Sequence, residues 1–175
     1  MQAHDIFPLS RADILKFSQM VRKKIGIPAD QAYVDIVKLM EHILPKIYPD
    51  FTLDILSRAA MGEHHGLTYP NKHLIQLRED VYEGACLGRG RDRFTVAHEI
   101  GHLIMHEGVD PRYARREVNE KMPKYLDPEW QSNAFAGYFL MSPDAIRGMN
   151  AVEVEAACGV SHDAAVVQLS ILAKK

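Results

Sequence analysis

Cysteine is scarce in this chain, which has only Cys86 and Cys158 among its 175 residues. The two cysteines lie far apart and outside any C-x-x-C pattern, which excludes a disulfide framework and a cysteine-rich zinc site. A zinc ion would therefore have to be held by histidine and carboxylate side chains.

Long apolar runs and a strong net charge are also missing. No run approaches the roughly 18 residues of a membrane span, and the amino-terminal residues lack the apolar core of a signal peptide. We therefore expect a soluble protein of the cytoplasm that binds no membrane. The formal net charge of −2 disfavours direct binding of nucleic acid, while a hydrophobic content of 47% is enough to bury a core.

The segment from 93 to 106, RFTVAHEIGHLIMH, carries the most informative pattern. His98, Glu99 and His102 form an H-E-x-x-H motif, and at about 100° per residue they fall on one stripe of a helix. Two imidazoles one turn apart can bind one zinc ion, and Glu99 beside them can act as the catalytic base. The competing interpretation, histidines that are only hydrogen-bonded, is weakened because shuffling the chain gives about 0.03 such motifs by chance.

A catalytic zinc ion needs a third protein ligand. His106 shares the stripe but lies about 12 Å beyond His98 along the helix axis, so we expect it to line the cleft instead. Glu129 is the better candidate, because Asn133 follows it by one turn and could orient a ligating histidine from outside. Spacing alone leaves four other acidic residues open: Glu107, Glu117, Glu120 and Asp127.

Hydrophobic periodicity predicts an α+β fold, mainly helical, with a small and mostly antiparallel sheet packed on the H-E-x-x-H helix. Ser10 caps a first helix that ends at Gly26, and Pro28 opens a second that runs to Pro45. From residue 51 the period changes to two, and the segments 67–69 and 72–78 flank a turn.

Helix signals return after residue 126. Asp127 and Pro128 form a cap followed by proline at the first helical position, and a further helix is expected from Ser142 to Gly148. We divide the chain into a catalytic domain, residues 1–148, and a carboxyl-terminal helical tail, residues 149–175.

The tail, residues 149–175, is expected to form two helices. Gly159 marks the turn and Ser161 the second cap, a layout that helix-turn-helix modules share. The second helix has no arginine or lysine before Lys174, which leaves few contacts for DNA phosphates. We expect the tail to pack on the domain or dock a partner.

Two stretches resemble the ImmA/IrrE family of gluzincin-like metallopeptidases. In that family an R-F-T-x-A-H-E-x-G-H-L helix precedes a helix that carries E-x-x-x-N-x-F-A and then L-M-x-P, and residues 93–106 and 129–143 carry these patterns. The resemblance is close over about residues 72–145. It implies a zincin-like domain in which His98, His102 and Glu129 bind zinc and Glu99 is the general base and proton shuttle.

The resemblance also implies a substrate. Similar proteins act on bacterial helix-turn-helix repressors in stress-response, mobile-element or toxin-antitoxin settings. We therefore expect a zinc-dependent endopeptidase that cleaves such a repressor, with the substrate extended along the 72–78 strand as an edge of the sheet. The alternative is a non-catalytic zinc-containing module that docks a repressor or toxin partner, and Glu99→Gln separates the two because docking does not need this carboxylate.

Overall fold

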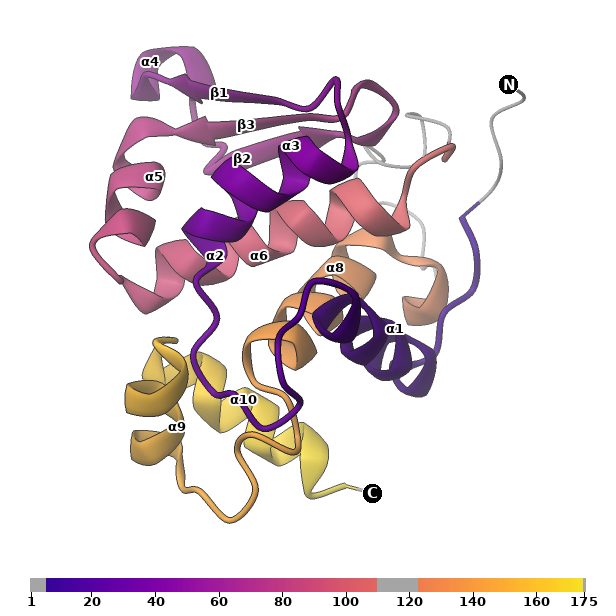
Figure 1. The fold of residues 1–175 in the computed structure, drawn as a ribbon, viewed down its shortest axis with the longest axis vertical. Coiled ribbons are helices and arrows are strands. Elements are labelled where there is room, and N and C mark those ends of the chain that lie inside the picture. The colour runs from indigo at the N-terminus through magenta and orange to yellow at the C-terminus, as the bar shows by residue number, and fades with distance from the viewer. Residues whose placement is uncertain (1–5, 110–122, 175) are drawn as a thin grey trace.

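The computed structural model describes residues 6–109 and 123–174, and its architecture is α+β (Figure 1). Helix α6 (Gly90–Met105) lies between a three-stranded sheet and helix α8 (Pro128–Leu140), and α1 (Arg11–Lys24) packs against α8. The expected fold class, mainly helical with a small sheet on the H-E-x-x-H helix, is confirmed. None of the helices in these two described ranges combines the length and hydrophobicity that crossing a membrane requires.

The sheet has the strand order β1-β3-β2 and is mixed rather than mostly antiparallel. Strand β1 (Thr52–Leu56) runs parallel to β3 (Leu74–Arg78), whereas β2 (Gly66–Tyr69) pairs with β3 in the antiparallel sense. The expectation that the 72–78 strand forms an edge is wrong, because β1 crosses over and pairs with its other side. The edge strand that packs against α6 is β2.

Shorter elements connect these parts. They are α2 (Ile36–Lys38), the π-helical turn η1 (Leu39–Ile43), α3 (Leu44–Ile47), α4 (Arg58–Met61), the 3-10 turn η2 (Pro70–Lys72), α5 (Glu79–Cys86) and the 3-10 turn η3 (Lys124–Leu126).

Two helix starts follow the local signals of the sequence. The Ser10 hydroxyl accepts from the Asp13 amide while the Asp13 carboxylate accepts from the Ser10 amide, a reciprocal capping box at the start of α1. At α8 the Asp127 carboxylate accepts from the Glu129 amide at 2.9 Å, and Pro128 occupies the first helical position. Both predicted starts are confirmed.

The helix predicted from Pro28 to Pro45 is wrong over its first part, because helical structure begins only at Ile36. The carbonyls of Pro28 and Gln31 accept hydrogen bonds from the buried Arg22 guanidinium instead of from amides one turn further along a helix. Pro45 lies within α3, directly after the π-helical turn η1, and does not end the helical run.

The carboxyl-terminal part differs from expectation in one element. The helix predicted from Ser142 to Gly148 is wrong, since the described residues there form turns. Beyond it, α9 (Ala151–Cys158) and α10 (His162–Leu172) are joined by Gly159, whose φ of 62° suits glycine, and Ser161 caps α10. The two-helix layout is present, but its identity as a helix-turn-helix module is not confirmed.

Arg93 joins α6 to the tail and to the segment before α2. Arg93 is 1% exposed, and its guanidinium donates to the carbonyls of Val34, Cys158 and Gly159, and also to the Tyr33 hydroxyl. Burial lowers the pKa of Arg93. Three segments distant in sequence therefore meet on one side chain.

We expect Arg93→Met to lower the free energy of unfolding by about 2–4 kcal/mol, because methionine fills the space but leaves buried carbonyls unpaired. Denaturant unfolding followed by circular dichroism measures this change. Arg91→Met, an exposed residue of the same helix, is the control. Equal stability of the two variants would contradict the role given to Arg93.

Candidate metal centre

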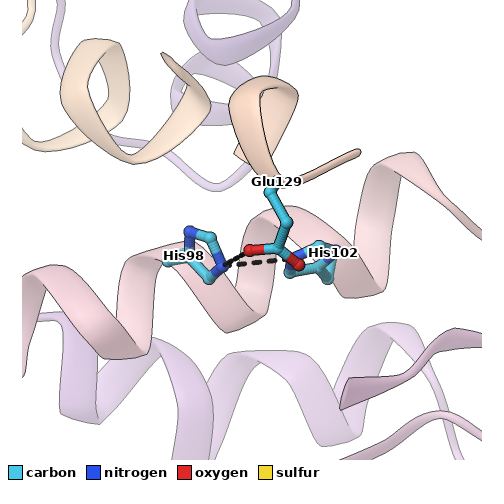
Figure 2. Close-up of side chains that lie close together, drawn as sticks. All are labelled: His98, His102 and Glu129. Atoms are coloured by element: carbon cyan, nitrogen blue, oxygen red, sulfur yellow. Dashed lines mark hydrogen bonds and ion pairs between the residues drawn. The ribbon is translucent and has the colours of Figure 1, made fainter. Parts of the chain in front are cut away.

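His98 and His102 project from α6 toward Glu129 at the start of α8 (Figure 2). The two Nε2 atoms lie 3.0 Å apart, and the Glu129 carboxylate oxygens lie 3.3 Å from His98 Nε2 and 3.2 Å from His102 Nε2. The ligand atoms of the three residues all lie within 4.8 Å of one another, so they could hold a metal ion. Two nitrogens and a carboxylate that converge in this way fit a divalent cation such as zinc.

Close packing of α6 and α8 brings Glu129 to the histidines. A Cβ atom on Gly101 would lie 3.0 Å from the Phe135 ring and 3.4 Å from the Ser132 Cα. A larger residue between the two histidines would push α8 outward. Glycine at this position therefore fits the short distance between the two sources of ligands.

Electrostatics tie Glu129 to the two imidazoles. Hydrogen bonds from His102 and His98 hold the pKa of Glu129 far below its ordinary value. Burial acts to lower the pKa of His98, but the hydrogen bond to Glu129 and the charges of Glu99 and Glu129 outweigh it and raise this pKa. The carboxylate is thus ionised and ready to serve as a ligand.

Glu99 is held by the edge strand β2. Its side chain is 6% exposed, and the Thr68 hydroxyl donates to Glu99 Oε2 at 2.6 Å. A Cβ atom on Gly66 would come within 2.6 Å of Glu99 Oε1, so glycine leaves the room that this carboxylate occupies. Sequence reasoning missed Thr68 and Gly66, since a short strand with one threonine carries no local signal of this contact.

Asn133 contacts His98, and His106 contacts His102, the other member of the histidine pair. Asn133 Oδ1 is 3.1 Å from His98 Nδ1, the contact that the sequence predicted. His106 does not line an open cleft as expected: it is 3% exposed, with its Nδ1 3.1 Å from His102 Nδ1. Burial, followed by the charge of His102, lowers the pKa of His106 to about 4. Its second contact, with Gln131, was not foreseen.

The other acidic candidates for the third ligand are engaged elsewhere or lie outside the described residues. Glu107 contacts His73 Nε2 at 3.3 Å, and Asp127 caps α8. Glu117 and Glu120 fall in the segment that the structure does not describe. Among the described residues, Glu129 is the acidic side chain that joins His98 and His102 in a candidate metal site.

The α+β fold with paired histidines and a glutamate from the next long helix defines the class of the chain as a metallopeptidase-like domain. Comparison with protein families matches residues 54–169 to the IrrE N-terminal-like domain of peptidase family M78. The chain belongs to this family, which confirms its resemblance to the ImmA/IrrE metallopeptidases. Comparison with curated proteins gives no match.

We expect the purified protein to bind about one zinc ion and Glu129→Gln to weaken this binding by more than about 100-fold, since even loss of a residue that only orients a ligand costs about 10–100-fold. Competition with a fluorescent chelator measures both affinities.

Glu107→Gln is the matched control, because it removes an exposed acidic candidate that contacts His73 instead. Unchanged affinity in Glu129→Gln together with a loss in Glu107→Gln would move the third ligand to Glu107.

Proposed function

We propose that the chain is a zinc-dependent endopeptidase that cleaves a helix-turn-helix transcriptional repressor. The observation that carries the peptidase proposal is the buried carboxylate of Glu99. It lies on the same helix as the two converging histidines and accepts a hydrogen bond from Thr68 of β2. Membership of a peptidase family supports the reaction class. The choice of repressor follows from the family resemblance.

His98, His102 and Glu129 would hold the ion, leaving a fourth position for the reaction. When bound there, zinc polarises the scissile carbonyl and lowers the pKa of a water molecule. Because the three residues would bring only one negative charge to a divalent ion, the centre would keep a net positive charge, which would favour the negative charge that develops on the scissile carbonyl oxygen.

Glu99 supplies the proton transfers of the proposed reaction. It takes a proton from the attacking water and later gives it to the nitrogen of the leaving amine, so the carboxylate returns to its starting state. The negative charge of Glu99 also contributes to raising the pKa of His98. The hydrogen bond from Thr68 orients the carboxylate through one oxygen.

Strand β2 is the proposed place for an extended substrate. It lies at the edge of the sheet, and its Thr68 contacts Glu99 directly. Backbone pairing with an edge strand holds a peptide straight while side-chain pockets choose its sequence. A chain paired with β2 would therefore pass next to the general base.

Replacing Glu99 by Gln should lower the cleavage rate by about 100- to 10,000-fold, because an amide cannot accept the proton, while zinc binding stays unchanged. The measurement uses mass spectrometry to count new amino termini in a proteome-derived peptide library and in a panel of purified helix-turn-helix repressors.

Glu83→Gln, an exposed residue of α5, is the control for the loss of one carboxylate. A Glu99→Gln protein that cuts at the parent rate would refute the mechanism. A parent protein that binds zinc and a repressor but cuts nothing would favour the non-catalytic docking module.

The Thr68 hydroxyl offers a finer test. Thr68→Val keeps the shape of the side chain but removes the donor to Glu99, so we expect kcat to fall by up to about 100-fold through misplacement of the carboxylate. Thr68→Ser keeps the donor and should stay near the parent rate. Equal rates of the serine and valine variants would show that this hydrogen bond does not position Glu99.

A further inference from the structure

A cavity of about 490 Å³ opens at the carboxyl end of α1. This volume lies within the range of sites that bind small molecules. Helix α1 contributes Gln19, Arg22 and Lys23 to its wall, the loop after the helix contributes residues 26–29, and the segment after α8 contributes Ser142. None of the described residues that line the cavity is acidic, and none belongs to the candidate metal centre.

Arg22 is a buried cation on this wall. It is 2% exposed, and its guanidinium donates to the carbonyls of Pro28, Gln31 and Phe139. In the described part of the chain no carboxylate forms an ion pair with it. The opposing group that acts on Arg22 is Cys158, a thiol that stays neutral because burial raises its pKa to about 11. A full positive charge therefore lies beside the cavity without a counter-charge.

The end of α1 adds a second cation and hides part of its own negative end. Lys23 is exposed and lines the cavity. The Ile27 amide donates to the Arg22 carbonyl at 2.8 Å and the Gly26 amide to the Lys23 carbonyl at 3.2 Å, with a φ of 78° at Gly26. These two bonds pair carbonyls that would otherwise repel an anion at a helix end.

Two residues of the wall also carry buried polar atoms without a hydrogen-bond partner in the described structure, Arg22 Nε and Ser142 Oγ. Both groups carry a hydrogen that can be donated. Since both atoms are shielded from solvent, Arg22 acts on the cavity through its charge. The exposed side chains of Gln19 and Lys23 would make the first contacts with a ligand.

We propose that this cavity binds a small organic anion, a carboxylate carried on a short apolar body. The carboxylate would face Lys23 and Gln19 in the positive field of Arg22, and the apolar body would pack against Ile27 and Ala29. Apolar lining makes the cavity less suited to inorganic phosphate, and the two positive charges disfavour a cation. The proposal does not depend on the metal centre or on peptidase activity.

The first test compares three probes of similar shape: hexanoate, its uncharged amide and hexylamine. We expect hexanoate to shift the backbone amide resonances of Lys23, Gly26, Ile27 and Ser142 in nitrogen-15 spectra of the full chain. A ligand of this size should saturate with a Kd of about 1 mM. Hexanamide should bind at least about 10-fold more weakly, because it lacks the charge, and hexylamine should not bind.

Two results of this titration would overturn the proposal. Equal affinity for hexanoate and hexanamide would show that the cations of the cavity do not select an anion. Shifts confined to His98 and His102 would show that the carboxylate goes to the candidate metal centre instead.

The second test changes the wall. Lys23→Gln should weaken hexanoate binding by about 3- to 10-fold, because it removes the exposed cation. Lys24→Gln is the matched control, an exposed neighbour that carries the same charge but does not line the cavity. Ala29→Phe should abolish binding by filling the space, and thermal unfolding shows whether this variant remains folded. Equal losses in the two lysine variants, or unchanged binding in a folded Ala29→Phe protein, would refute the site.

Discussion

The contact between α6 and α8 at Gly101 sets the distance between the two sources of ligands. Both histidines come from α6 and the carboxylate from α8, so the three residues of the candidate metal site meet only because these helices approach closely. The Phe135 ring and the Ser132 backbone fill the space beside Gly101. The contact that packs α6 against α8 therefore also brings the histidines to Glu129. On the sheet side of α6, the Thr68 hydroxyl donates to the Glu99 carboxylate.

Local signals predicted the parts of the fold that are decided within a few residues. The capping box of Ser10 and Asp13, and the Asp127 cap, lie within one helical turn and can be recognised in the sequence. The extended segment after Pro28 could not be recognised, because its carbonyls are used by Arg22. The pairing of β1 with β3 is likewise a tertiary choice, since an intervening strand, β2, comes first along the chain.

In the candidate site too, the sequence predicted the residues that are close along the chain and missed contacts between distant ones. His98, Glu99 and His102 share one helix, so their spacing predicted their proximity. Glu129 needed the second motif of the family in addition, because several acidic residues had comparable spacing. The contacts of Thr68 with Glu99 and of Gln131 with His106 join residues 31 and 25 positions apart, and no periodicity in the sequence links them.

The Phe7 carbonyl connects the segment before α1 to Gln131, which contacts His106 next to the histidine pair. Phe7 is 66% exposed, so its side chain alone gives no reason to keep this residue when the amino terminus is shortened. A clone that starts at Ser10 would keep every helix that the structure describes and discard one of the two carbonyl oxygens that accept hydrogen bonds from Gln131. Boundaries for expression are therefore better drawn upstream of residue 7 than at the first helix cap.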